Sequence, residues 1–532
     1  MNLLKNRVLI LGLLLVISLF FRLIWISKIP YGLNWDENAY AYNAYSLFLT
    51  GKDELSGQFA LYFRSFGDYK PALASYMLVP LFSIFGPSDL SVRLLPAILG
   101  TLGITCFYQF MRRITNNLAG LITAVVMTLS PLYMHFSRAV MDPIVGLSFL
   151  LFGLLLLTYK SLISQIGAAL FLILSMYSYN SSRFFVPAIV TIYLLVISKN
   201  SLMLTIKKYW LFLSLLIFLG SIIIFQTLFG LAGSRMRFLL LSNEPYIAVE
   251  TNKHYDSCVK ADLPLCRIIA NRRIILAREI TKNYLLHFQP DFLFFNRNYP
   301  TTSYPEYGNL LLITLPFLII GFFTMNRYNK KINIFFLLWL LLAPIPSAIT
   351  NDVPHPGRFL NGLPALSYFI SLGFITVINS VKELKNKKRL IYVILSVFII
   401  NFLFYIKDYA LIYKQDSEYY FQGFFREVIP YVWNKRDDYS QIYFSKEYAD
   451  PYIFFAWINK VNPYLIQKDK NRNSINNIHF VPSNQIAMLF NKKIPSSLFV
   501  SNKKLSAGHL VKEFKSLSIY SPAHTWFYVY EY

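Results

Sequence analysis

The sequence predicts a membrane-embedded all-α bundle of about eleven transmembrane helices, followed by a small soluble α/β domain. The chain has 532 residues, of which 55% are hydrophobic and 17% aromatic, and its mean hydropathy is +0.44. Apolar runs of roughly 18 to 20 residues recur along it, and each is long enough to cross a bilayer core as a helix. The segment after residue 406 is more polar, which indicates a different environment.

The apolar runs divide the first part of the chain into spans. The first run lacks a small-x-small cleavage pattern, so we expect it to be retained as a helix rather than removed as a signal peptide. The predicted spans are residues 8–27, 90–111, 118–136, 143–159, 163–179, 184–198, 209–231, 309–325, 332–350, 360–380 and 390–406.

The formal charge of +24 is distributed in a way that predicts the orientation of these spans. If the N-terminus is cytoplasmic, the inside connections carry basic residues and a single acidic one, Glu383. Every other Asp and Glu then lies on the opposite side, which is the asymmetry that the positive-inside rule describes. The basic excess is therefore a topology signal rather than a sign of nucleic-acid binding.

Three segments are predicted to lie outside the cytoplasm: loops 28–89 and 232–308, and the domain 407–532 that follows the transmembrane domain 1–406. Within the first loop, "PALASYMLVPLFSIFG" is too short for a span, so we expect a helix at the membrane interface. In the C-terminal segment, "YYFQGFFREVIPYVW" is typical of a helix. There "SQIYFSKEY" and "PYIFFAWI" are predicted to be strands.

The chain has three cysteines. Cys106 lies in a predicted span, where it serves as a small apolar residue. Cys258 and Cys266 lie in the second outside loop, where an oxidising compartment favours a disulfide between them. A zinc site is disfavoured because His254 is the only nearby additional ligand, so no protein-held metal is predicted.

The stretch "GLNWDENAYAYNA" places two carboxylates, Asp36 and Glu37, after the first span. Asn34 and Glu37 fit a capping box that starts a helix, with Asn34 as the N-cap residue. This structural interpretation accounts for Glu37 and leaves Asp36 unexplained. A carboxylate at the mouth of a transmembrane bundle also marks functional sites, so both interpretations stand.

Further polar residues are predicted on the same side of the bundle. Each has a structural alternative: Lys70 and Arg138 could bind lipid headgroups, Asp142 could start a helix, and His355 could lie in a turn close to Arg358. Together with the carboxylates they predict a site for an anionic, phosphate-bearing substrate and a hydroxyl group to be deprotonated.

Five motifs give the chain a resemblance to a known family. They are "NWDE", "GDYKP", "SVRLLPAILG", "SPLYMHFSRAVMDP" and "HPGRFLNGLPAL". In this order and on this side of the membrane they resemble the bacterial branch of the C-type glycosyltransferases, relatives of protein O-mannosyltransferases and aminoarabinose transferases. The resemblance covers roughly residues 5–405 in order and topology.

The resemblance implies that a sugar is transferred from a polyprenyl-phosphate carrier to an acceptor on the outer face, usually with inversion. By the same resemblance, Asp36 is the general base that removes the proton of the acceptor hydroxyl. Glu37 orients the site or stabilises the helix start. Asp142 matches a second outside acid whose role varies within the family.

The resemblance also implies a set of cations for the departing lipid phosphate. These are Lys70 with one of Arg138, His355 and Arg358, whose charge would offset the charge that grows as the glycosidic bond breaks. The lipid-linked sugar is the co-substrate, and the use of a divalent metal stays open. No Gly-rich phosphate loop follows a strand and no D-x-D motif stands out, so a nucleotide-sugar enzyme is disfavoured.

Two other functions fit the same features. A transporter or flippase of lipid-linked sugars would also need cations for phosphate, although its charges are expected near the membrane midplane. A polymerase or ligase of surface polysaccharide would use the same donor with a glycan acceptor. The acceptor is therefore a glycan, a lipid or a protein, and the expected location is the inner or plasma membrane.

Overall fold

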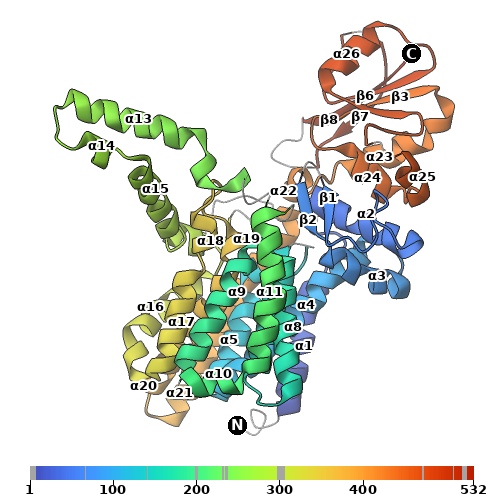
Figure 1. Cartoon of the computed structure of the whole chain (residues 1–532). Helices are drawn as coiled ribbons and strands as arrows, with labels where there is room; N and C mark the ends of the chain where they lie inside the picture. Colours follow the sequence, from blue (N-terminus) through green and yellow to red (C-terminus); the bar gives the residue numbers. More distant parts are fainter. Residues whose placement is uncertain are drawn as a thin grey trace.

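The computed structural model of the chain is mostly helical. It describes residues 7–65, 68–139, 142–197, 202–230, 233, 238–295, 306–469, 472–506, 508–517 and 524–532, so parts of loop 232–308 lie outside the described residues. A bundle of helices occupies one half of the molecule, and a sheet domain sits over one end of it (Figure 1). The first helix, α1 (Arg7–Leu23), begins at the opposite end of the bundle (Figure 1). The predicted fold class is confirmed.

Each of the predicted spans coincides with an apolar helical segment in the described part of the chain. Among the described residues, six segments are long and apolar enough to cross a membrane. They are α4 (Asp89–Ile114), α9 (Asn180–Ile192) with a π-helical turn (Tyr193–Ile197), α11 (Trp210–Phe229), α17 (Lys330–Leu342) with α18 (Ile345–Ala348), α19 (Pro356–Phe359) with α20 (Leu363–Ser380), and α21 (Leu384–Leu411).

The other predicted spans coincide with apolar helices of 10–17 residues. They correspond to α1 (Arg7–Leu23), α5 (Asn117–Leu129), which leads into α6 (Pro131–Phe136), α7 (Asp142–Leu157), α8 (Leu162–Ser178) and α16 (Leu315–Thr324). A short helix, α10 (Leu202–Lys208), lies at the same end of the bundle as the start of α1 (Figure 1).

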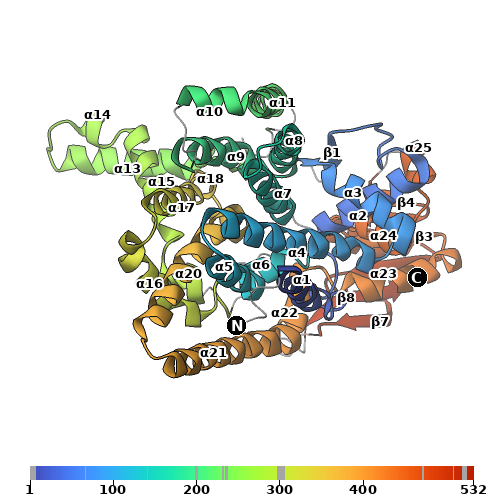
Figure 2. The same cartoon turned by 90° about the horizontal axis from the view of Figure 1, so that it is seen from below.

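Burial divides the bundle into central and peripheral helices. α4 and α20 are mostly buried, whereas α11 and α21 are mostly exposed and lie at the outside of the bundle when it is viewed along its length (Figure 2). Their exposed faces carry large apolar side chains such as Phe218 on α11 and Leu403 on α21. Exposed apolar side chains in this number are favourable in contact with lipid and unfavourable in contact with water.

The first outside loop begins with α2 (Trp35–Thr50), whose start is fixed by the predicted capping box. The Asn34 side chain accepts a hydrogen bond from the Glu37 amide at 2.8 Å, and the Glu37 carboxylate accepts one from the Asn34 amide at 3.0 Å. The helix ends at Gly51, which has a φ of 69°, a conformation that favours glycine. The segment predicted at the interface forms α3 (Leu73–Phe85), which packs on α2 and α4.

A hairpin of two short antiparallel strands joins α2 to α3. The strands are β1 (Tyr62–Ser65) and β2 (Asp68–Pro71), and their register places Phe63 opposite Lys70. In Figure 1, α2, α3 and the hairpin lie between the helix bundle and the sheet domain.

The C-terminal domain contains a six-stranded sheet in the order β4-β5-β3-β6-β8-β7. The central strand β3 pairs in parallel with β5 and β6, and the other pairings are antiparallel. The strands are β3 (Gln441–Ser445), β4 (Ser474–Ile475), β5 (Ile478–Val481), β6 (Ser497–Ser501), β7 (His509–Lys515) and β8 (Thr525–Glu531). The helices are α22 (Tyr413–Tyr420), α23 (Phe425–Asn434), α24 (Pro451–Ile458), α25 (Pro463–Asp469) and α26 (Ser483–Asn491).

The sequence predicted β3 and α23 correctly, but the strand predicted for "PYIFFAWI" is wrong. This segment is α24, with Pro451 in its first turn and all residues from Pro451 to Trp457 buried. A short, uniformly apolar run has no periodicity that separates a buried strand from a buried helix. The predicted domain boundary after residue 406 falls within α21, which continues to Leu411.

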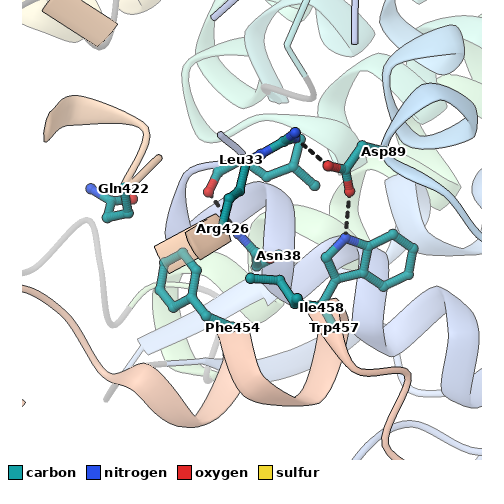
Figure 3. A pocket seen from close by; sticks show the side chains of 8 residues that line it. All are labelled: Leu33, Asn38, Asp89, Gln422, Arg426, Phe454, Trp457 and Ile458. Carbon is teal, nitrogen blue, oxygen red and sulfur yellow. Dashed lines mark hydrogen bonds and ion pairs between the residues drawn. The ribbon is translucent and has the colours of Figure 1, made fainter. Parts of the chain in front are cut away.

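α24 attaches the C-terminal domain to the first outside loop and the bundle. The ring of Trp457 stacks on Phe82 of α3 at 5.7 Å, and its indole donates to Asp89, the first residue of α4, at 2.8 Å. Arg426 of α23 forms an ion pair with the same carboxylate. Asp89, Arg426 and Trp457 line a small cavity together with Asn38 (Figure 3). One hydrophobic core continues from the bundle into this domain.

A helical arm extends from the same end of the bundle as the sheet domain, but on the opposite side of the molecule (Figures 1 and 2). It consists of α13 (Pro245–Lys260), α14 (Cys266–Ile269) and α15 (Arg272–Leu286) (Figure 1). The disulfide expected between Cys258 and Cys266 is present and closes its tip. At the base, the His287 ring is buried between Phe292 and Phe359, with centroids at 5.2 and 5.6 Å. This contact joins the arm to α19.

The burial of His287 predicts a pH-dependent stability. Burial lowers the pKa of His287 from 6.5 to about 4. Between these values the unfolded chain binds the proton more tightly than the folded one, so stability is lost as the pH falls from 6.5 to 4. His287→Phe should remove this pH-dependent part of the free energy of unfolding, which is on the order of 3 kcal/mol. The measurement is the unfolding midpoint at several pH values between 4 and 6.5. The partly exposed His254 provides the control: an equal effect of His254→Phe would contradict the prediction.

Candidate active site

The connection between α1 and α2 is held by two buried arginines from later helices. Arg93 of α4 donates to the backbone carbonyls of Ile26 at 2.9 Å and Pro30 at 2.8 Å, and also to that of Gly32. Arg138, which follows α6, donates to the carbonyl of Ile29 at 3.0 Å. An arginine presents several donors in a fixed fork, so it can satisfy carbonyls that no helix or sheet pairs.

Arg93 also carries the charge that compensates Glu37. Its Nε lies 3.3 Å from the Glu37 Oε1, and both side chains are completely buried. Glu37 therefore closes the capping box with one oxygen and meets Arg93 with the other. A buried carboxylate is tolerated only when it is paired in this way.

Asp36 has a different environment from its neighbour. Its carboxylate forms an ion pair with the Lys70 ammonium on β2, and 33% of its side-chain surface is exposed, against 6% for Lys70. The ammonium also lies 5.9 Å from the centre of the Tyr40 ring. The structure thus brings together Asp36 from the start of α2 and Lys70 from β2, and leaves the carboxylate partly exposed.

Asp142 belongs to the same group of residues. It accepts a hydrogen bond of 2.5 Å from the Tyr40 hydroxyl, and Tyr40 lies one turn after Asp36 on the same face of α2. Arg183, at the start of α9, interacts electrostatically with Asp142 and donates to the Tyr62 hydroxyl at 3.4 Å.

His355 and Arg358 form a second cluster around Asp352. The His355 Nε2 lies 3.5 Å and the Arg358 Nη2 3.7 Å from the Asp352 carboxylate. His355 also caps α19 by accepting a hydrogen bond from the Arg358 amide at 3.2 Å. Arg358 donates further to the Thr350 hydroxyl at 2.8 Å. No contact between this cluster and Asp36 is found among the described residues.

The structure adds residues that the sequence analysis did not single out. Tyr40 and Arg183 complete the group around Asp36, and Arg93 determines the environment of Glu37. Arg183 stands at the outer end of a predicted span, the same signal that pointed to Arg138. Arg138 itself supports the end of α1 and the α1–α2 connection, because its guanidinium donates to the carbonyls of Phe21 and Arg22 in the last turn of α1 and to that of Ile29.

Chemically, the arrangement combines an accessible carboxylate with a buried ammonium at one end of an apolar bundle. A carboxylate can accept a proton from a hydroxyl, and an ammonium can bind a phosphate oxygen. No group of three or more His, Cys, Asp or Glu side chains that could hold a metal ion occurs among the described residues. Metal dependence stays a matter of prediction.

An apolar helical bundle with such a site beneath an α/β domain has the architecture of the C-type membrane glycosyltransferases. The comparisons with known proteins confirm the resemblance. Residues 69–225 match the family model for dolichyl-phosphate-mannose-protein mannosyltransferase. The matched segment includes Lys70, Arg138 and Asp142 and begins after Asp36. A search of the curated proteins finds no match to the chain.

Solved structures of ArnT show the same fold. ArnT from Cupriavidus metallidurans in the apo state has a TM-score of 0.53 at 10% identity, and the match covers 98% of this chain and 97% of ArnT. ArnT bound to undecaprenyl phosphate gives a TM-score of 0.51 at 11% identity, with the same coverage. The archaeal oligosaccharyltransferase AglB from Archaeoglobus fulgidus, in complex with an inhibitory peptide and a dolichol-phosphate, matches at 14% identity with a TM-score of 0.49, over 84% of this chain and 63% of AglB. This chain therefore has the fold of the C-type glycosyltransferases, and its residues 69–225 are similar to the mannosyltransferase family.

The buried Glu37–Arg93 pair predicts a large loss of stability when one partner is removed. Arg93→Met removes the counter-charge of the Glu37 carboxylate and the Arg93 hydrogen bonds to the Ile26, Pro30 and Gly32 carbonyls, which should cost about 3 to 5 kcal/mol. The loss is measured as the free energy of unfolding in detergent. Arg113→Met is the control on the same helix, because Arg113 is exposed over the Tyr159 ring and should contribute no more than about 1 kcal/mol. Equal losses would contradict the assigned role of Arg93.

Proposed function

We propose that this protein transfers a sugar from a polyprenyl-phosphate donor to an acceptor on the extracytoplasmic face of the membrane. The observation that carries the proposal is the Asp36–Lys70 ion pair, which joins a proton acceptor to a phosphate-binding cation at the mouth of an apolar bundle. A lipid-linked donor needs a bilayer-facing scaffold, and a polar acceptor needs an aqueous entrance. The partly exposed Asp36 fits the acceptor side, and the buried Lys70 fits the donor side.

In the proposed reaction, Asp36 takes the proton of the acceptor hydroxyl as its oxygen attacks the anomeric carbon. The bond between that carbon and the phosphate oxygen breaks, and the lipid phosphate leaves with the bonding electrons. Lys70 stabilises the negative charge that grows on this phosphate. Attack from the side opposite to the phosphate inverts the configuration of the sugar.

The remaining residues support these roles. Asp142 orients Tyr40 through its 2.5 Å hydrogen bond, and Tyr40 in turn flanks the Lys70 ammonium. His355 and Arg358 are candidates for a second contact to the phosphate. Arg138 would act indirectly, by supporting the α1–α2 connection.

We further propose that the N-terminus is cytoplasmic and the sheet domain extracytoplasmic. The start of α1 and the basic helix α10 lie at one end of the bundle, and the site with its covering domain lies at the other (Figure 1). This separation agrees with the positive-inside rule. The site then faces the side where the acceptor, whether glycan, lipid or protein, is found.

Replacement of Asp36 tests the chemistry. Asp36→Asn should reduce transfer by about 100-fold to 10,000-fold, because an amide cannot accept the acceptor proton. Purified wild type and variant are incubated with a panel of polyprenyl-phosphate sugars and cell-envelope extract, and donor consumption is followed by mass spectrometry. The control is Asp437→Asn, since the Asp437 side chain is 80% exposed in the C-terminal domain.

The outcomes separate the candidate functions. Consumption by wild type and the control, but not by Asp36→Asn, supports the proposal and identifies the sugar. Turnover by Asp36→Asn close to that of wild type would remove Asp36 as the base. No consumption of any donor by wild type would favour a transporter of lipid-linked sugars.

Replacement of Lys70 tests donor binding. Lys70→Ala should weaken the binding of undecaprenyl phosphate about tenfold or more, since a charge-assisted contact to a phosphate contributes roughly 1.5 to 3 kcal/mol. Affinity is measured by titration in detergent. Lys282→Ala, which removes an ammonium with 66% of its side chain exposed on α15, should leave it unchanged. An unaltered affinity of Lys70→Ala would exclude Lys70 from the donor site.

A further inference from the structure

Glu54 is a buried carboxylate outside the site described above. It lies in the connection between α2 and β1, and its side chain keeps 4% of its surface exposed. The Arg472 Nη2 donates to its Oε1 at 2.7 Å, and the Tyr452 hydroxyl donates to its Oε2 at 3.0 Å. Both partners come from the C-terminal domain. A carboxylate buried in this way is strongly destabilising without its partners.

Glu54 is also attached to the helix that carries Asp36. Its amide donates to the Asn43 side chain at 3.1 Å, and the Asn43 amide group reaches its carboxylate at 3.5 Å. Asn43 lies seven residues after Asp36, on the same face of α2. The position of Glu54 is therefore coupled to that of α2.

Arg472 is attached to the hairpin that carries Lys70. The same Nη2 that contacts Glu54 donates to the backbone carbonyl of Arg64 at 2.9 Å. Arg64 lies on β1 opposite Tyr69, the residue before Lys70 on β2. One nitrogen of the C-terminal domain thus bridges the α2 side and the hairpin side of the first loop.

We propose that Glu54 and Arg472 are positioning residues of the donor site, which hold α2 and the β1–β2 hairpin so that Lys70 faces Asp36. The C-terminal domain then supplies part of the framework of the catalytic unit. This inference rests on the proposed function, because it takes Lys70 as the ligand of the donor phosphate.

The electrostatics of Glu54 agree with this role. Burial raises the pKa of Glu54 above its ordinary value, and the Arg472 guanidinium is the strongest influence in the opposite direction. Loss of Arg472 leaves the carboxylate without its main compensating charge and the Arg64 carbonyl without this donor. The hydrogen bonds from Arg472 to Glu54 and to the Arg64 carbonyl are then lost together.

The test is the binding of undecaprenyl phosphate to full-length variants. Arg472→Gln should weaken binding by about the same factor as Lys70→Ala, roughly tenfold. In the Lys70→Ala background, Arg472→Gln should have no further effect on affinity, because both changes act through the same contact. Arg472→Lys should keep most of the affinity, since a single ammonium can donate to both acceptors.

Arg426→Gln is the matched control. It also breaks an arginine–carboxylate pair between the C-terminal domain and the membrane part, the pair with Asp89, but that pair touches neither Glu54 nor the hairpin in the described residues. Its affinity for undecaprenyl phosphate should equal that of wild type. Equal weakening by Arg426→Gln would show that any loosening of the domain suffices, and would overturn the specific role of Arg472.

The results distinguish this inference from the proposed function. Weak binding by Lys70→Ala with normal binding by Arg472→Gln overturns the inference and leaves the donor site intact. Normal binding by Lys70→Ala overturns the donor site and the inference with it. If Arg472→Gln does not fold, Tyr452→Phe provides the test, because it removes one hydrogen bond from Glu54. A loss of affinity smaller than that of Lys70→Ala would support the inference. An unchanged affinity would overturn it.

Discussion

The fully buried Glu37–Arg93 ion pair is the interaction on which the rest of the site depends. A guanidinium enclosed in the bundle needs a counter-charge, and the unpaired carbonyls of the α1–α2 connection need donors. Arg93 meets both requirements at once. The connection can therefore be buried, and α2 starts at one defined residue. Successive residues on a helix differ in direction by about 100°, so Asp36 points away from the interior that holds Glu37.

Two adjacent carboxylates thus occupy different environments for a geometric reason. Glu37 is saturated by the capping box and by Arg93, and it has no exposed surface left for a substrate. Asp36 has the Lys70 ammonium on one side and remains partly exposed. The structural interpretation of "NWDE" describes Glu37, whereas Asp36 is the residue to which the proposed function assigns the chemistry. The C-terminal domain adds the second constraint, because its side chains hold the loop on which Lys70 stands.

Hydropathy and local capping rules were sufficient for much of the fold. The bilayer length of the apolar runs locates the helices, and the Asn34–Glu37 spacing fixes the start of α2. The prediction for residues 451–458 failed because α24 is buried on all sides and shows no helical period. Tyr40 could not be recognised as a neighbour of Lys70 and Asp142, since an aromatic residue on a helix is most often part of a hydrophobic core. The Glu54–Arg472 contact joins residues 418 positions apart, and no local pattern encodes such a pairing.

The bridge from the sheet domain to the first loop also has a consequence for biogenesis. Protein synthesis proceeds from the N-terminus, so the loop with Glu54 is made long before Arg472 leaves the ribosome. During that interval the bundle can insert into the membrane, yet the framework around Lys70 lacks its last support. If Lys70 holds the donor phosphate, a nascent or truncated chain would bind lipid-linked sugar poorly. The order of translation would then keep the carrier pool from being consumed by unfinished enzyme.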